Sequence, residues 1–151
     1  MQSTLRLLGW IGVSFVPALV GLPFTAPDWY RRLHKPRWAP PPSVFGPVWS
    51  LLYILIGTAA WRLSTADRSK RVPLRLFALQ LVLNAAWTPI FFGLRQPGIA
   101  FAEIVGTWFA IVATLVAFAR TRLVAAALLL PYLAWVTFAA ALNWSIWRSN
   151  R

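Results

Sequence analysis

Few residues in this sequence could act as catalysts or hold a metal ion. The chain of 151 residues has three acidic residues, of which Glu103 is the one glutamate, a single histidine, His34, and no cysteine. The lack of cysteine excludes disulfides, thiolate ligands and cysteine nucleophiles, and so few histidines and glutamates do not suit a protein metal site. No Ser-His-Asp arrangement, phosphate-binding loop or carboxylate pair is present. We therefore expect no metal and no required cofactor.

The other residues with chemical potential are amides, aromatic rings and small residues that recur with helical spacing. Gln80, Asn84, Trp87 and Phe91 follow at intervals of four, three and four, which is one face of a helix. Similar stripes are formed by Trp49, Tyr53 and Gly57, by Pro131, Trp135, Ala139 and Asn143, by Glu103, Thr107, Ala110 and Thr114, and by Ser14, Pro17 and Gly21. Such stripes are typical of a wall around a flat, mostly apolar guest. They are also typical of helix interfaces in membranes, so the spacing leaves both interpretations open.

Some of these residues need a partner if they lie inside a membrane. Glu103 can pair with Arg95 or a basic loop residue, or it can take part in proton chemistry or ligand binding. Trp87, Trp108 and Trp135 lie deep in apolar segments, where an indole N–H needs an acceptor. Their depth favours a site near them.

Five apolar segments must position these stripes. A soluble domain is about a quarter charged, whereas this chain is 59% hydrophobic and only 12% charged. A spanning helix needs about 20 apolar residues, and such segments cover about 7–24, 44–63, 72–94, 97–119 and 123–147. The sequence thus predicts an all-α, multi-pass integral membrane protein, a five-transmembrane-helix bundle forming one domain over residues 1–151.

The basic residues neither indicate nucleic acid nor orient the bundle. The net charge is +12, but the Lys and Arg residues lie between apolar runs, where lipid headgroups account for them. The connections must alternate between the membrane faces, which puts eight basic residues on one face and seven on the other. The eight are Arg6, Arg62, Arg68, Lys70, Arg71, Arg75, Arg120 and Arg122; the seven are Arg31, Arg32, Lys35, Arg37, Arg95, Arg148 and Arg151.

Several motifs together resemble those of one family. The first is Trp29-Tyr30-x-x-Leu33-x-Lys35-Pro36-x-Trp38-x-Pro40-Pro41, followed by Phe45 and Trp49. Further matches are Pro17-x-x-x-Gly21, Asn84-x-x-Trp87-x-Pro89-x-Phe91-Phe92-Gly93, Pro131-Tyr132-x-x-Trp135 and Leu142-Asn143. This pattern resembles the TspO/MBR family, the tryptophan-rich sensory proteins of bacteria and the mitochondrial translocator protein, once called the peripheral benzodiazepine receptor.

The resemblance implies a five-helix membrane bundle, commonly a homodimer, whose first loop folds over a pocket. That loop is 25–43, where Pro36, Pro40, Pro41 and Pro42 prevent either neighbouring helix from continuing. We expect it to form a lid. Family members bind porphyrins such as protoporphyrin IX and haem, sterols in some lineages, and synthetic isoquinoline carboxamides and benzodiazepines. Membrane lipids are further expected partners, and porphyrin enters as ligand rather than cofactor.

The family's motifs imply which residues of this chain bind the ligand. They are Tyr30, Trp49, Tyr53, Asn84, Trp87, Trp135 and Ala139. The sterol-recognition pattern of animal relatives requires a tyrosine where this chain has Trp144. This departure counts against a sterol and favours a bacterial member in the cell membrane.

The resemblance implies tetrapyrrole handling, transport or stress sensing. One alternative is light- and oxygen-dependent porphyrin degradation, with Trp49 and Trp135 as the catalytic residues. A further alternative is a ligand-modulated regulator of a membrane partner.

Overall fold

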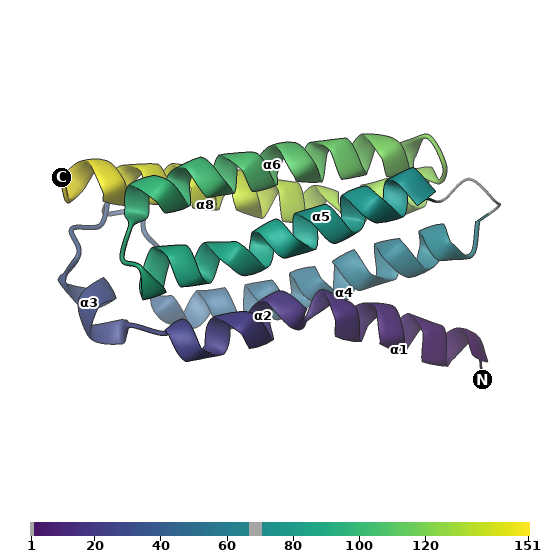
Figure 1. Ribbon diagram of the computed structural model, residues 1–151, viewed down its shortest axis with the longest axis horizontal. Helices are drawn as coiled ribbons and strands as arrows, with labels where there is room; N and C mark the ends of the chain where they lie inside the picture. The colour runs from purple at the N-terminus through teal and green to yellow at the C-terminus, as the bar shows by residue number, and fades with distance from the viewer. Residues whose placement is uncertain (1, 67–70) are drawn as a thin grey trace.

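The computed structural model describes residues 2–66 and 71–151, and its helices run nearly parallel to one long axis (Figure 1). Five helical spans, Gln2–Phe24, Pro42–Ser64, Val72–Gly93, Pro97–Ala119 and Leu123–Ser149, are long and apolar enough to cross a membrane. No strand occurs among the described residues. The predicted five-helix membrane bundle is thereby confirmed.

The spans begin and end close to the expected positions, but the first one starts earlier. α1 (Gln2–Ser14) begins at Gln2, so Arg6 lies within the helix, and the last span continues to Ser149. The remaining long helices are α4 (Phe45–Ser64), α5 (Arg71–Thr88), α6 (Pro97–Ala119) and α8 (Leu130–Ser149).

Three spans are interrupted near prolines, which lack an N–H donor and clash with the preceding turn. The first breaks at Phe15 and continues as α2 (Val16–Gly21) and the 3-10 turn η1 (Leu22–Phe24). The third ends in a π-helical turn, η3 (Pro89–Gly93), closed by a hydrogen bond from Leu94 N to Pro89 O. The fifth begins as α7 (Leu123–Ala127) and restarts as α8, with Pro131 in its first turn.

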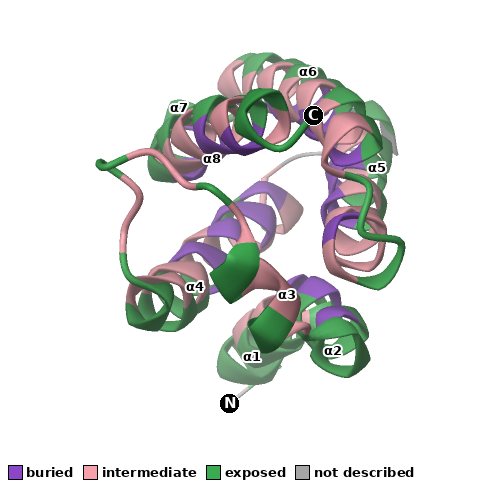
Figure 2. Cartoon of the chain, turned by 90° about the vertical axis from the view of Figure 1, so that its left-hand side faces the viewer, coloured by how far each residue is buried: buried purple, intermediate pink, exposed green. Residues whose placement is uncertain are grey.

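The spans form a ring. α4 packs against α1 and α7, α5 against α2 and α6, and α6 against α8. α1 and α4 approach each other closely, since a Cβ placed on Gly57 would lie 2.5 Å from the Ile11 Cα. Buried faces turn inward in the view along the bundle (Figure 2), and exposed apolar residues such as Val82 and Phe109 cover the outside. This outward apolar surface suits lipid.

The connections alternate between the two ends of the bundle. At one end, Arg122 Nη1 donates to Arg62 O and to Thr65 Oγ1, both at 3.0 Å, which ties the start of α7 to the end of α4. The N-terminus lies at this end, and the C-terminus and α3 lie at the other (Figure 1). Arg68 and Lys70, counted in the larger basic group, lie outside the described residues.

The first loop is more ordered than its prolines suggested. It contains a two-turn helix, α3 (Pro27–Arg32), and the 3-10 turn η2 (Pro42–Val44) that leads into α4. Pro27 occupies the first helical position, where its missing N–H does no harm. The extended conformation of Leu33 then ends α3.

Candidate functional site

A cavity of about 430 Å³ lies in the half of the bundle where α4 begins. Every span contributes to its wall, which is made by Phe15, Pro17, Ala18, Gly21, Leu22, Thr25, Phe45, Gly46, Trp49, Ser50, Tyr53, Asn84, Trp87, Thr88, Glu103, Ile104, Thr107, Trp135, Val136 and Ala139. The cavity exists because α4 packs against α7 at one end but makes few contacts with α8 at the other.

Six of the seven residues that we expected to bind a ligand line this cavity. They are Trp49, Tyr53, Asn84, Trp87, Trp135 and Ala139. The seventh, Tyr30, lies on α3, where its ring packs against Phe91 at 6.4 Å and Phe92 at 5.7 Å. Tyr30 is therefore outside the wall, in the layer of rings that joins the lid to η3.

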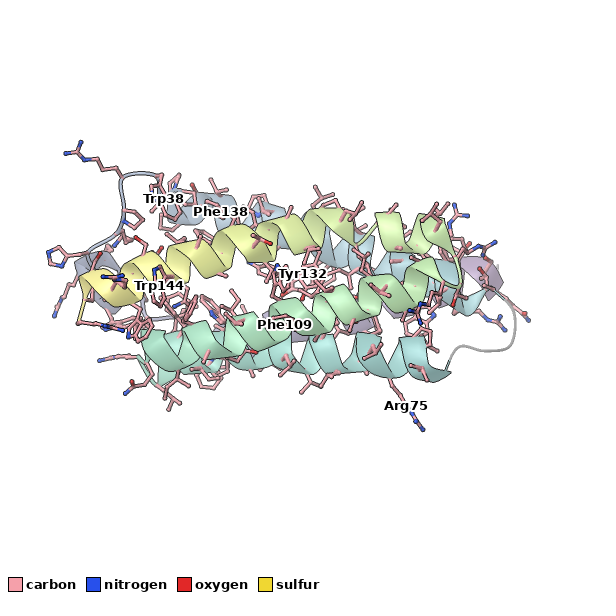
Figure 3. All side chains as sticks on the ribbon, turned by 90° about the horizontal axis from the view of Figure 1, so that it is seen from above. Trp38, Arg75, Phe109, Tyr132, Phe138 and Trp144 are labelled. Atoms are coloured by element: carbon pink, nitrogen blue, oxygen red, sulfur yellow. The ribbon has the colours of Figure 1, made fainter. Side chains whose placement is uncertain are left out.

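Hydrogen bonds hold the polar part of the wall in place. The Tyr53 hydroxyl donates to Asn84 Oδ1 at 3.2 Å, and Asn84 Nδ2 donates to the Tyr132 hydroxyl at 2.7 Å. That hydroxyl in turn donates to Gln80 Oε1 at 2.9 Å. Tyr132 is fully buried at the centre of the bundle (Figure 3). The network joins α4, α5 and α8, so it fixes the orientation of both tyrosines.

A second set of hydrogen bonds orients Trp87. Its Nε1 donates to Asn143 Oδ1 at 3.0 Å, and Asn143 Nδ2 donates to Pro97 O at 2.8 Å. The Trp87 ring also stacks on Phe91, with centroids 4.7 Å apart and planes 19° apart. One residue on each of η3, α6 and α8 thus holds this indole of α5 in place.

The other two indoles of the wall are held by rings. Trp49 stacks on Tyr53 with centroids 5.3 Å apart and meets the Tyr132 edge at 6.2 Å. Trp135 contacts Phe45 at 5.8 Å and Phe138 at 5.3 Å. The buried Trp135 Nε1 has no hydrogen-bond partner among the described residues.

Aromatic contacts fasten the lid to the bundle, and a lysine binds α3 within the lid itself. Trp29 meets Phe91 at 5.5 Å, and Trp38 meets Phe138 at 5.7 Å (Figure 3). Lys35 Nζ donates to Tyr30 O at 2.6 Å and lies 4.6 Å from the centre of the Tyr30 ring. Burial raises the pKa of Tyr30, so its phenol remains neutral beneath the lysine.

The cavity opens at one side of the bundle. Its exposed lining residues are Ala18, Leu22, Thr25, Gly46 and Ser50. Ala18 and Leu22 belong to the end of the first span, Thr25 to the start of the lid, and Gly46 and Ser50 to the first turns of α4. The opening therefore lies between α2 and α4, beside the lid.

Glu103 lines the cavity without an ionic partner. Thr107 Oγ1 donates to its Oε1 at 2.7 Å, whereas Oε2 is buried and makes no hydrogen bond. The expected ion pair with Arg95 is absent, since the ion pair found among the described residues joins Arg31 and Asp28. These residues also bring together no group of three histidines, cysteines or acids that could hold a metal.

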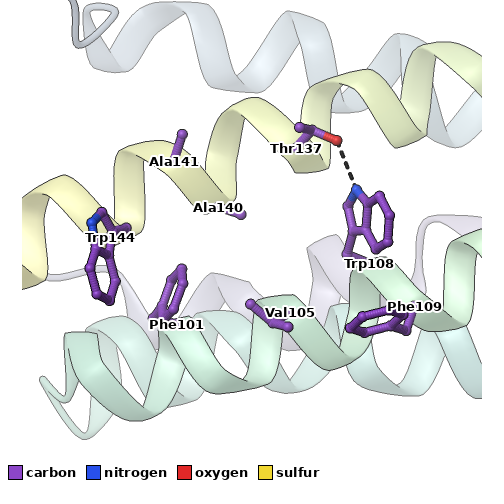
Figure 4. A pocket seen from close by; sticks show the side chains of 8 residues that line it. All are labelled: Phe101, Val105, Trp108, Phe109, Thr137, Ala140, Ala141 and Trp144. Atoms are coloured by element: carbon purple, nitrogen blue, oxygen red, sulfur yellow. Dashed lines mark hydrogen bonds between the residues drawn. The ribbon is translucent and has the colours of Figure 1, made fainter.

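Trp108 is deep in its span but does not reach the cavity. It lies in an outer groove of about 620 Å³ between α6 and α8, lined by Phe101, Val105, Trp108, Phe109, Thr137, Ala140, Ala141 and Trp144 (Figure 4). Its Nε1 donates to Thr137 Oγ1 at 2.8 Å. The indole N–H therefore finds its acceptor on the outer surface, and depth alone was a misleading criterion.

The expected list of site residues was also incomplete. Phe15 and Phe45 line the cavity although no polar stripe includes them. Their position depends on the break at Phe15 and on where α4 begins, which helical spacing does not reveal. Pro17, Gly21, Glu103 and Thr107 also line it, and the stripes did contain these four.

Comparisons with known proteins all point to the same family. The sequence model of the TspO/MBR family matches residues 6–148. The chain is 41% identical to the tryptophan-rich protein TspO of Chlorobaculum tepidum, over 99% of this chain and 98% of that one. It is 42% identical to the translocator protein of Homo sapiens, over 93% and 89% of the two chains. It is 36% identical to the tryptophan-rich sensory protein of Cereibacter sphaeroides, over 95% and 90%.

Proposed function

Because the chain belongs to the TspO/MBR family, we propose that its cavity binds a flat tetrapyrrole such as protoporphyrin IX or haem. The observation that carries this proposal is the cavity lined by three indoles, Trp49, Trp87 and Trp135. A volume of about 430 Å³ is within the range of small-molecule sites, which are mostly apolar with a few fixed polar groups.

The fixed rings suit a flat aromatic guest. Trp87 is held by a hydrogen bond and a stacked neighbour, and Trp49 by a stacked tyrosine. Such rings lose little side-chain entropy when a ligand packs against them. Their faces and edges favour offset or edge-on packing against another aromatic system.

The propionates of a tetrapyrrole must lie at the opening. The residues lining the cavity include no lysine, arginine or histidine, and a buried carboxylate without a cation is costly. On the lid, Arg31 pairs with Asp28, and Lys35 binds backbone carbonyls. Arg32 and Arg37 are exposed and have no polar partner in the described chain, so we propose them as the propionate contacts.

Quenching of tryptophan fluorescence by protoporphyrin IX tests the proposal in purified, detergent-solubilised protein. Two substitutions on α8 form a matched pair. Trp135→Ala removes an indole from the cavity wall, and Trp144→Ala removes one from the outer groove. We expect saturable binding that Trp135→Ala weakens about tenfold or more, as for a central aromatic contact, and that Trp144→Ala leaves within about twofold. Equal affinity in both variants would contradict binding in the cavity.

Photo-oxidative degradation of the bound pigment is a second candidate activity. It is favoured by the presence of Trp49 and Trp135 in the same cavity wall, where both indoles would flank an excited macrocycle. Illuminated, aerated mixtures with protoporphyrin IX should then form new absorbing products. The double variant Trp49→Phe, Trp135→Phe should still bind the pigment but form fewer products. An unchanged product yield would leave binding as the only supported activity.

A further inference from the structure

Glu103 is the acidic residue of the cavity wall and has an incomplete set of hydrogen bonds. Its Oε1 accepts from Thr107 Oγ1 at 2.7 Å, one turn further along α6. Its Oε2 is buried without a partner. A buried carboxyl oxygen without a donor carries a desolvation penalty, so its presence in a mostly apolar wall needs an explanation.

The protein around Glu103 provides no compensating charge. No basic residue lines the cavity, and no basic side chain in the described ranges 2–66 and 72–151 forms an ion pair with Glu103. Ionisable residues inside a membrane protein usually face a cavity and pair with one another or with a ligand. Because the described chain offers Glu103 no ionic partner, such a partner would have to reach it from the cavity.

From these observations we infer that Glu103 recognises a nitrogen donor, and that the cavity selects flat aromatic ligands carrying a basic N–H group over neutral ones of the same shape. The inference rests on the proposed use of the cavity as a ligand site, but not on a tetrapyrrole being the ligand. A charge-assisted hydrogen bond from such a group would give the carboxyl oxygen Oε2 the donor that it lacks. The rings of Trp49 and Trp87 would hold its aromatic part, and Thr107 would keep the carboxyl in place.

Acridine and 9-aminoacridine are suitable probes, since they share one ring system and the second adds an amino group and is cationic at neutral pH. Binding of each is measured by tryptophan quenching in a non-ionic detergent, with protein-free micelles as the blank. We expect at least about tenfold tighter binding of 9-aminoacridine, the size expected of one hydrogen bond to a charged group.

Two variants assign this preference to the carboxyl. Glu103→Gln keeps the shape and removes the charge, so the preference should fall to about threefold or less while the affinity for acridine stays the same. Thr114→Val removes a hydroxyl that donates to Ala110 O on the same helix, outside the cavity lining, so the preference should persist. If Glu103→Gln does not fold, Glu103→Asp, which withdraws the carboxyl by one methylene, should lower the preference in the same direction.

Equal affinity of the wild-type protein for the two probes would overturn the inference. It would indicate that a water molecule donates the missing hydrogen bond to Glu103 Oε2. An undiminished preference in Glu103→Gln would overturn it as well. These failures are distinct from failure of the proposed function, which would appear as absent protoporphyrin IX quenching in the wild-type protein whatever the acridines do.

Discussion

Asn150 binds both backbone groups of His34. Its Oδ1 accepts a hydrogen bond from His34 N at 2.9 Å, and its Nδ2 donates to His34 O at 3.0 Å. The same Nδ2 also donates to Ile146 O at 2.7 Å in the last turns of α8. A single side chain at the end of the fifth span thus fastens the middle of the lid.

Loss of this attachment should loosen the lid without disturbing the bundle. Asn150→Ala removes both bonds to His34, each worth about 0.5 to 1.5 kcal/mol, so bound protoporphyrin IX should dissociate about tenfold faster. Hydrogen–deuterium exchange in residues 25–43 should rise in parallel. Ser149→Ala, at the neighbouring exposed position, serves as the control. Unchanged exchange in Asn150→Ala would show that the aromatic contacts of the lid suffice.

Replacing Asn84 should destabilise the bundle more than removing one hydroxyl that it binds. Asn84→Leu deprives the Tyr53 hydroxyl of its acceptor and the Tyr132 hydroxyl of its donor. We expect a loss of about 1 to 3 kcal/mol in the free energy of unfolding, measured by titration with a denaturing detergent. Tyr53→Phe removes one bond of the same network and should cost below about 1 kcal/mol. The reverse order of the two losses would refute this account.

Gly57 should not tolerate a side chain. A Cβ there would meet the Ile11 backbone, with Cα at 2.5 Å and N at 2.8 Å, and backbone cannot move aside as a flexible side chain can. Gly57→Val should therefore separate α1 from α4 and cost about 1 to 3 kcal/mol or more. Gly106→Ala is the contrasting substitution, because nothing lies within 4 Å of its added methyl group; its unfolding free energy should stay the same or rise.

Bulk at the opening should slow ligand entry. Ala18 is exposed and lines the cavity, whereas Val20 on the same helix is exposed but does not line it. Ala18→Phe should lower the association rate of protoporphyrin IX about tenfold, a change within the range over which association rates of related complexes vary, and Val20→Phe should leave it unchanged. Stopped-flow quenching measures both rates. Equal association rates would mean that ligand enters elsewhere, for example past the lid.

Helical spacing and hydropathy were sufficient to predict the number of spans and their approximate ends, because lipid imposes both length and apolar composition. They also identified the faces on which Trp49, Asn84 and Trp135 lie. Depth along a span, however, says nothing about rotation around it. Trp108 has the same depth signal as Trp87 but points to the outer groove.

The remaining differences come from contacts between distant segments. The break at Phe15 turns its ring toward Tyr53, at 5.2 Å, and into the cavity, which no local pattern in the first span predicts. Likewise, α3 is a short helix stabilised by packing of Tyr30 on η3 and by Lys35 at its end. Its intrinsic propensity was too weak to be read from a proline-rich segment.

An opening between α2 and α4 also determines whether occupancy depends on the ligand's concentration in lipid or in water. Because exposed lining residues such as Leu22 and Ser50 lie on the flank of the bundle, we expect an apolar guest to arrive from the surrounding lipid rather than from water. Occupancy then follows the mole fraction of the guest among lipids, so adding empty lipid at constant total ligand dilutes the guest and empties the protein.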